Sequence, residues 1–368
     1  MSALKRTLDL SRLAAVLCLA CAIAFAANTV GFKTGKAELK SAGPMAFGPD
    51  GVLFVGDSAG AAVFAIDTGD KKRNAQGGAF EIKAINTKIA AMLGTTPDQI
   101  LINDVVVNPL SKNVYISVSR GSGTASAPMI LRTDSSGKLT EVALDKVSHA
   151  SVAIPDAPDP AAKDNRGQSR RMEAITDIGF IDGKVIIAGL SNEEFSSTLR
   201  SIPFPFRESA KGANIEIFHG AHGRFETNAP VRTFVGFEIE KKPHLLAAYT
   251  CTPLVKIPVS ELKAGSKVKG TTIAELGNRN RPLDMIVYRK DGADYILMAN
   301  SSRGVMKLPA KNLESYEPIT AKTDKQGVPY ETIASLKGVQ QLDKLDDRNA
   351  LMLAEDAGSL DLRSIPLP

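Results

Sequence analysis

The side chains best suited to chemistry gather in the second half of the chain. His219 and His222 lie in the segment IEIFHGAHGRFETN, residues 215–228, and His244 and Cys251 follow soon after. In a loop, the His219/His222 pair can chelate one Cu²⁺ or Zn²⁺, with Cys251 or a carboxylate as the third ligand. The alternative is a histidine pair that caps loop carbonyls or packs on a strand, because H-x-x-H alone is not a specific metal motif. The sequence leaves both interpretations open.

A second set of polar side chains recurs at the starts of apolar segments. Asp104 stands in INDVV, Asp177 in ITDIG, Asp284 in PLDMI, and Gln341 in VQQLD. If these segments surround one channel, the carboxylates converge, and their charges need a cation, shared protons or nearby arginines. A hard cation such as Ca²⁺ with oxygen ligands is one interpretation. The other is that each aspartate accepts backbone N–H bonds at the start of its strand.

The elements that position these residues form a repeat. The first unit reads GPMAFGPDGVLFVGDSAGAAVFAIDT, the third begins ITDIGFIDGKVIIAGL and the fifth begins PLDMIVYRKDGADYILMAN. In each unit, apolar segments flank turns such as PDG, IDG or KDG, which is typical of hairpins. Candidate fourth strands follow as AFEIKAI, KLTEVAL, NIEIFHG, TTIAELG and YETIASL. Units of four strands in series predict an all-β fold, a six-bladed β-propeller, with one helix at TKIAAMLG.

The last unit ends after its third strand, so the ring needs a strand from elsewhere. KAELKS, residues 36–41, precedes the first unit and is predicted to be the N-terminal outer strand that closes the last blade. Such closure removes the open edges of the ring. We therefore predict a single propeller domain over residues 27–368.

Residues 1–26 are typical of a secretory signal peptide. A basic start is followed by an apolar run over residues 13–25 and by Ala24-Phe25-Ala26, a small-x-small cleavage site. The run is short for a membrane span, so a secreted or periplasmic protein without a span is predicted after cleavage. Cleavage also removes Cys18 and Cys21. The remaining Cys251 is then buried and inert, paired with another molecule, or a ligand.

Composition excludes some functions. Removing residues 1–26 lowers the formal charge from +5 to +3, and no basic tract remains, which disfavours nucleic-acid binding. The chain has no tryptophan from which a quinone cofactor could form, and no C-x-x-C-H for covalent haem. A small-molecule ligand or substrate, or a protein partner, is expected instead.

The propeller register predicts which side chains share the mouth of the channel. His219 and His222 are expected on the aspartate side and His244 on the opposite side, while His149 is expected on a surface loop. The insertion over residues 153–174 should cross the mouth, where its arginines either hold an anionic group or are simply solvated. The side chains expected on this side include Asp57, Arg120, residues 191–194, Cys251, Ser302, Asp356, Arg166, Arg170 and Arg171.

The segment GPMAFGPDGVLFVGDSAGAAVFAID resembles the repeat of six-bladed propellers related to gluconolactonase, paraoxonase and strictosidine synthase. The resemblance implies a divalent cation, usually Ca²⁺, held in the channel by Glu, Asn and Asp side chains, and hydrolysis of lactones or esters. By position, Asp104, Asp177 and Asp284 match the cation ligands, with Asn103 and Glu173 as neighbours.

Three functions follow. The first is a cation-dependent hydrolase of lactone-like or ester substrates, in which the cation polarises a carbonyl and Asp177, Glu193 or a loop histidine is the general base. The second is a non-catalytic ligand- or protein-binding propeller. The third is a periplasmic copper or zinc protein built on His219 and His222. The residues expected to contact a ligand are His219, His222, Glu173, Cys251 and Gln341.

Overall fold

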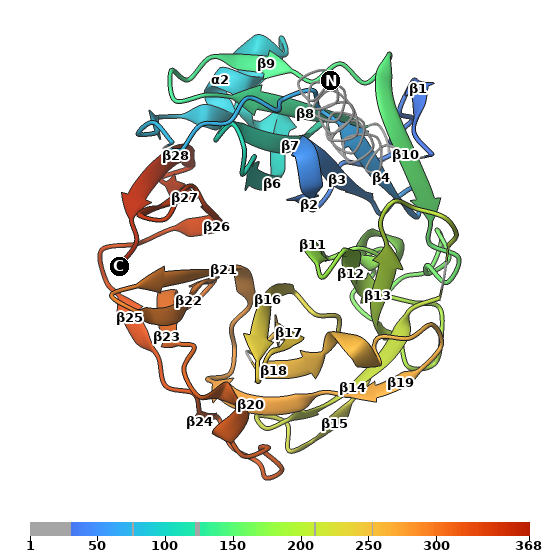
Figure 1. Ribbon diagram of the computed structural model, residues 1–368, viewed down its shortest axis with the longest axis vertical. Coiled ribbons are helices and arrows are strands. Elements are labelled where there is room, and N and C mark those ends of the chain that lie inside the picture. The colour runs from blue at the N-terminus through green and yellow to red at the C-terminus, as the bar shows by residue number, and fades with distance from the viewer. Residues whose placement is uncertain (1–30, 76, 122–125, 210, 252) are drawn as a thin grey trace, which may run out of the picture.

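The computed structural model describes residues 31–75, 77–121, 126–209, 211–251 and 253–368. The predicted signal peptide lies outside these residues. Six small sheets stand as blades around one axis, which confirms the predicted all-β, six-bladed propeller (Figure 1). No helix among the described residues is long and apolar enough to cross a membrane. We name each blade by its innermost strand.

The first three blades in chain order are the β2, β6 and β11 blades. The β2 blade has β2 (Met45–Phe47), β3 (Val52–Asp57), β4 (Ala62–Asp67), β10 (Val147–Ala153) and β1 (Lys33–Gly35). The β6 blade has β6 (Ile100–Val107), β7 (Val114–Arg120), β8 (Ala127–Thr133) and β9 (Leu139–Glu141). The β11 blade has β11 (Asp177–Ile181), β12 (Lys184–Leu190), β13 (Ser197–Pro203), β14 (Ala213–His219) and β15 (Arg224–Glu226), with β19 (Lys267–Lys269) parallel to β14.

The other three blades follow in chain order. The β16 blade has β16 (Thr233–Ile239), β17 (Lys242–Ala248), β18 (Pro253–Pro258), β20 (Thr271–Leu276) and β24 (Lys325–Gly327). The β21 blade has β21 (Pro282–Lys290), β22 (Ala293–Asn300), β23 (Gly304–Pro309) and β25 (Glu331–Ile333). The β26 blade has β26 (Val339–Lys344), β27 (Asn349–Asp356), β28 (Ser359–Pro366) and β5 (Glu81–Ile82). The predicted helix is α2 (Ile85–Met92).

The Asp-Gly turns identified in the sequence make the tight connections between innermost and second strands. Asp182 and Gly183 join β11 to β12 with φ values of 51° and 71°. Asp291 and Gly292 join β21 to β22 with φ values of 50° and 80°. Two successive positive φ values match the twist of an antiparallel hairpin, and Asp-Gly adopts them at low cost. These turns are the reason that the hairpin boundaries could be predicted.

An N-terminal strand closes the last blade, as predicted, but the strand is not KAELKS. Residues 36–41 form no strand; instead the N–H groups of Lys40 and Ser41 both donate to the Asp57 carboxylate at 2.8 Å. The closing strand is β5, in which Ile82 pairs with Leu362 of β28. The segment AFEIKAI, predicted as the fourth strand of the first blade, therefore belongs to the last blade.

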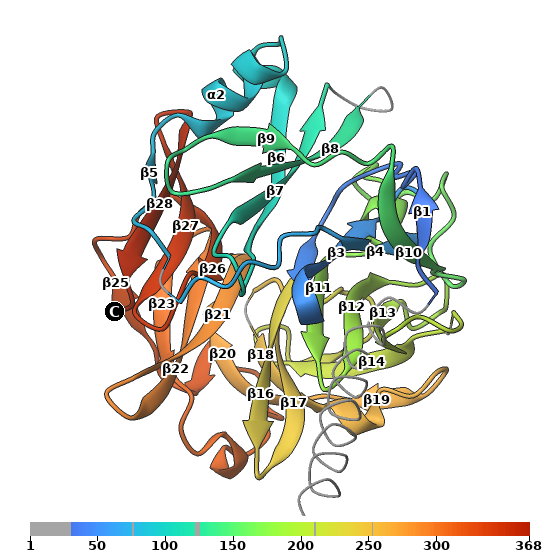
Figure 2. The same ribbon diagram turned by 45° about the horizontal axis from the view of Figure 1, so that its top comes forward.

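The first two blades do not follow chain order around the ring. The β6 blade lies between the β26 blade and the β2 blade, and β2 contacts β11 on its other side (Figure 1). After β4 the chain leaves to form β5 and the β6 blade, and then β10 returns to pair with β4 (Figure 2). The prediction of a loop at His149 was wrong, because this residue is buried in β10 and pairs with Ile66.

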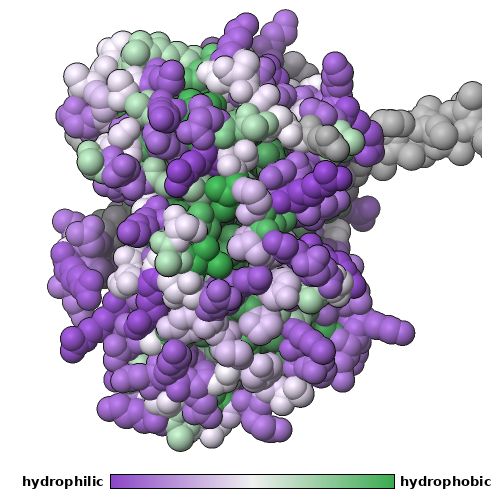
Figure 3. Space-filling view, turned by 90° about the vertical axis from the view of Figure 1, so that its left-hand side faces the viewer, coloured by the Kyte–Doolittle hydropathy of each residue, from purple (hydrophilic) through white to green (hydrophobic). Residues whose placement is uncertain are grey.

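The hydrophobic cores lie between adjacent blades and fix their order. One core packs Ile89 of α2 together with Ile116 of β7 and Leu353 of β27. Another joins Phe54 of β3 to Ile187 of β12. The side of the molecule shown in Figure 3 is mostly hydrophilic, with an apolar strip near its middle. The ring is therefore held by packing between blades, which leaves the channel and its two mouths for polar side chains.

Candidate functional site

The predicted aspartates lie on innermost strands at the channel. Asp104 is on β6, Asp177 begins β11, and Asp284 is on β21. The register shifts immediately before Asp104 and Asp284, and a similar shift precedes Gln341 on β26. A fourth aspartate, Asp343, was missed by the sequence analysis although it stands in the same VQQLD segment.

Each of these four carboxylates ties two innermost strands together. One oxygen accepts the N–H of the following residue, as between Asp177 and Ile178 at 2.8 Å. The other oxygen accepts an N–H from an adjacent blade. These bonds run from Met45 to Asp104 (2.7 Å), from Phe234 to Asp177 (2.8 Å), from Leu342 to Asp284 (2.7 Å) and from Val107 to Asp343 (2.6 Å).

The channel disfavours the charged form of these groups. Desolvation raises the pKa of Asp104 and of Asp177 to about 7, and that of Asp343 to about 6. It also raises the pKa of Asp284 well above its usual range, and repulsion from Asp104 adds to the effect. With its amide nitrogen turned toward them, Gln341 donates to Asp284 at 3.1 Å and to Asp104 at 3.0 Å. Backbone and amide donors thus surround the carboxylates.

The aspartates do not form a compact ligand set. Among the described residues, one group of three or more His, Cys, Asp or Glu side chains has its ligand atoms all within 4.8 Å of one another. That group is His219, His222 and Cys251. Asn103 donates its amide N–H to Ala42 and to Ser119. The cation-ligand role of Asp104, Asp177, Asp284 and Asn103 stays a prediction, and the observed contacts are those of strand ties.

The structure does not bring the two predicted catalytic carboxylates together. Asp177 lines the channel cavity of about 430 Å³, whereas Glu193 lines a separate cavity of about 930 Å³ at the channel mouth. Glu193 accepts a hydrogen bond from Lys211 at 2.8 Å. Glu173, just before β11, accepts one from Arg232 at 2.6 Å. Each glutamate is thus paired with a basic side chain, and the functional role of each stays a prediction.

The two histidines flank the turn of the β14–β15 hairpin. His219 ends β14, and its carbonyl accepts the N–H groups of His222 at 3.1 Å and of Gly223 at 2.8 Å. The N–H of Gly220 donates to Oε1 of the buried Glu275 at 2.6 Å. A Cβ on Gly220 would lie 2.8 Å from Cγ of Glu275, so only glycine fits without a shift. The HGAHG sequence thus folds the turn back onto β20.

This hairpin and the β17–β18 turn bring three ligand-type side chains together. A ring nitrogen of His219, a ring nitrogen of His222 and Sγ of Cys251 all lie within 4.8 Å of one another. His219 is buried, Cys251 is half-buried and His222 is exposed. Of the two third ligands considered from the sequence, Cys251 or a carboxylate, Cys251 thus lies in one group with the histidine pair. His244 stands apart on β17, where its Nδ1 contacts the carbonyl of Lys242 at 2.9 Å.

Glu226 orients both histidine rings. Its Oε2 lies 2.8 Å from Nδ1 of His219, and its Oε1 lies 2.7 Å from Nδ1 of His222. Burial opposes ionisation, but hydrogen bonds from His219 and His222 lower the pKa of Glu226 to about 2. An ionised carboxylate only accepts hydrogen bonds, so each Nδ1 is the donor. The nitrogens that remain for a metal ion are therefore the two Nε2 atoms.

Nε2 of His219 is buried and has no hydrogen-bond partner among the described residues. An unsatisfied buried polar atom costs about 1–3 kcal/mol, so its retention calls for a partner other than the residues that the structure describes. Cys251 is held nearby in a left-handed conformation, φ +65°, and its N–H donates to the carbonyl of Asn280 at 2.8 Å. The donor set fits a borderline transition metal ion.

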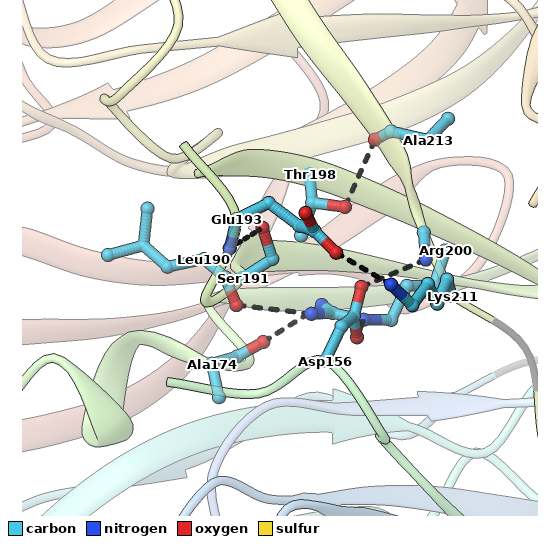
Figure 4. A network of polar contacts seen from close by, with 10 residues as sticks. Asp156, Ala174, Leu190, Ser191, Glu193, Thr198, Arg200, Lys211 and Ala213 are labelled. Atoms are coloured by element: carbon cyan, nitrogen blue, oxygen red, sulfur yellow. Dashed lines mark hydrogen bonds and ion pairs between the residues drawn. The ribbon is translucent and has the colours of Figure 1, made fainter. Parts of the chain in front are cut away.

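Cys251 also lines the 930 Å³ cavity at the channel mouth. The insertion over residues 153–174 crosses this region and is anchored by a buried ion pair, Arg200 to Asp156 at 2.8 Å (Figure 4). The Arg200 guanidinium also donates to the carbonyls of Ala174 and Leu190. Of the three insertion arginines, Arg166 and Arg170 line the cavity, whereas Nε of Arg171 donates to a carbonyl within the insertion.

No family model and no curated protein matches this chain. Among solved structures, a protein described as an oxidoreductase (glucose dehydrogenase) from Thermus thermophilus is 13% identical, covers 91% of this chain and 100% of its own, and has a TM-score of 0.37. The PQQ-bound aldose sugar dehydrogenase of Streptomyces coelicolor is 12% identical, with 91% and 98% covered and a TM-score of 0.28.

A structure described as a gluconolactonase is 8% identical, with 91% of this chain and 92% of its own covered and a TM-score of 0.28. Likenesses of this size decide nothing about chemistry. The resemblance to six-bladed propellers predicted from the repeats holds at the level of the fold, which the six sheets establish by themselves. The chain is thus a six-bladed β-propeller with a His-His-Cys cluster, of which Cys251 lines a cavity.

Proposed function

We propose that this propeller binds a copper or zinc ion through His219, His222 and Cys251. The observation that carries the proposal is the buried Nε2 of His219, which has no partner within the described part of the chain and lies in a group of three ligand-type side chains. One ligand atom of each of the three side chains already lies within 4.8 Å of the other two, so metal bonds of about 2.0–2.3 Å require the side chains to move closer together.

The donor chemistry favours a transition metal over Ca²⁺. Imidazole and thiolate ligands suit copper and zinc, whereas calcium takes oxygen ligands. Glu226 supplies the carboxylate that commonly accepts the second N–H of a metal-bound histidine, and this contact raises the basicity of the ligand. Three protein ligands leave a fourth position of a tetrahedral ion for water or a bound molecule.

Two other functions remain as predictions. A divalent-cation-dependent hydrolase of lactone-like or ester substrates would place its cation, Ca²⁺ by preference, among Asp104, Asp177 and Asp284. The double hydrogen bonding of each carboxylate favours a structural role instead. A non-catalytic binding propeller would require no metal. We place the function outside the cytoplasm on the strength of residues 1–26 alone.

The test is the metal content of the purified protein. The protein is isolated from its native compartment without chelator or metal-affinity resin, alongside His219→Ala/His222→Ala, Cys251→Ser and the control His244→Ala. We expect about one copper or zinc per chain in the wild type and in His244→Ala, and loss in the other two variants. Calcium lost only from Asp104→Asn/Asp284→Asn, or a well-folded wild type without metal, would contradict the proposal.

A further inference from the structure

The 930 Å³ cavity at the channel mouth carries an excess of positive charge. Its volume lies within the range of about 300–1,000 Å³ found for small-molecule sites. Its described lining includes six basic residues and three acidic ones. They are Lys163, Arg166, Arg170, Arg232, Arg279 and Arg281 against Asp164, Glu193 and Glu194.

The acidic residues offset only part of this charge. Glu193 is paired with Lys211, which lies outside the lining. Asp164 accepts the backbone N–H groups of Arg166 and Gln168, both at 2.8 Å. The Arg232 guanidinium is engaged by Glu173. Neither Asp164 nor Glu193 makes a hydrogen bond or ion pair with a guanidinium group of the cavity, although charge attraction from Arg166 and Arg170 adds to the backbone hydrogen bonds that lower the pKa of Asp164.

Four other guanidinium groups line the cavity. Those of Arg166, Arg170, Arg279 and Arg281 make no hydrogen bond or ion pair with any described residue. Desolvation and repulsion from Arg232 lower the pKa of Arg281, and attraction from Glu173 offsets only part of this effect. Like charges held together around one cavity are stabilised by a bound anion.

The segment that carries Arg279 and Arg281 is rigidly held. Between them, the buried Asn280 side chain donates to the carbonyl of Gly277 and accepts from Asn300 at 3.0 Å. The N–H of Arg281 donates to Oγ of Ser301 at 2.9 Å. Such anchoring lowers the entropy lost when the two guanidinium groups close on a ligand.

We propose that this cavity binds a small molecule with two or more carboxylate or phosphate groups. Arg279 and Arg281 contact these groups from one side, and Arg166 and Arg170 contact them from the insertion. Guanidinium groups bind both kinds of anion through paired N–H donors. Cys251 in the wall places the anion beside the candidate metal ligands. The anion site rests on the arginines alone and holds whether or not the cluster binds a metal.

The experiment is calorimetric titration of metal-free protein with four probes at constant ionic strength in chloride buffer. Inorganic phosphate and pyrophosphate form the phosphate arm, and succinate and citrate form the carboxylate arm. The variants are Arg279→Gln/Arg281→Gln, Arg166→Gln/Arg170→Gln on the exposed insertion, and the control Arg289→Gln, a surface arginine near Asp294. Thermal unfolding checks that each variant is folded.

We expect saturable one-site binding in at least one arm, weakened roughly tenfold or more by either double variant and unchanged in Arg289→Gln. The arm that saturates identifies the anion class. If Arg279→Gln/Arg281→Gln fails to fold, the insertion variant decides the question. Absence of saturable binding to all four probes, or equal weakening by Arg289→Gln, would overturn the proposal.

Discussion

Glu226 lies 2.8 Å from Nδ1 of the buried His219, across the β14–β15 hairpin that the two residues share. The same carboxylate reaches His222 with its other oxygen. One acidic side chain therefore fixes both rings and selects the nitrogens that remain free. In the proposed metal site, this arrangement would hold the two imidazole ligands in a fixed orientation.

Replacing Glu226 should weaken metal binding without abolishing it. Glu226→Gln removes the negative acceptor and allows the rings to reorient, so we expect affinity for zinc or copper to fall roughly 10- to 100-fold. The measurement is competition against a chromogenic chelator. Glu216→Gln, on β14 with His219, is the control and should keep wild-type affinity. Equal affinities in all three proteins would show that Glu226 does not support the ligands.

The channel aspartates predict an unusual pH dependence of stability. Because the folded pKa values of Asp104 and Asp177, about 7, exceed the unfolded value of 3.8, the folded state binds protons more tightly. Their contribution is fully present below pH about 3.8 and is lost as the pH rises through about 7. We expect the free energy of unfolding of chelator-treated protein to fall between pH 6 and 8, roughly one unit either side of the folded pKa values.

Asp104→Asn should flatten this pH dependence, because an amide does not titrate. The measurement is denaturant unfolding at each pH, in chelator and again with added calcium. A stability that rises with pH only when calcium is present would instead support a cation among the aspartates.

The buried ion pair beneath the insertion should be costly to break. Asp156→Asn leaves the fully buried Arg200 without its countercharge, so we expect a loss of about 3–5 kcal/mol in the free energy of unfolding. Denaturant titration measures the loss. The exposed pair between Lys211 and Glu193 in the same view offers the control, and Lys211→Gln should leave stability unchanged (Figure 4). Similar effects of the two substitutions would contradict this account of the anchor.

Gly220 should tolerate no side chain. In Gly220→Ala the new Cβ would lie 2.8 Å from Cγ of Glu275, so the hairpin must move or the protein must lose about 1–3 kcal/mol of stability. We also expect weaker metal binding, because His219 and His222 move with the turn. Gly35→Ala on β1, where no atom lies within 4 Å of the new Cβ, is the matched control. Thermal unfolding and chelator competition on both variants check the prediction, which an unchanged Gly220→Ala protein would refute.

Local signals made the blades predictable but not their order. The Asp-Gly turns, as at Asp182-Gly183, determine which strands pair within a hairpin. They carry no information about the blade that a fourth strand joins. β5 pairs through only two residues, and β10 returns to β4 across the whole β6 blade, so both depend on long-range packing that no short pattern encodes.

Part of the candidate metal site could be predicted from the sequence. The spacing of His219 and His222 and the position of Cys251 were enough to nominate the three, since all were expected on the same side of the predicted propeller. Glu226 was missed because its role depends on the β14–β15 hairpin, which the sequence analysis treated as a single outer strand. Asp343 was missed because a register shift in β26 places it, and not only Gln341, at the channel.

The most direct test of the central claim is a crystal structure of the natively purified protein with anomalous data collected above and below the copper and zinc edges. The account predicts one strong anomalous peak within bonding distance of His219, His222 and Cys251, with two nitrogen ligands and one sulfur. A peak among Asp104, Asp177 and Asp284 with none at the histidines, or an empty His-His-Cys cluster in protein soaked with copper and zinc, would contradict it.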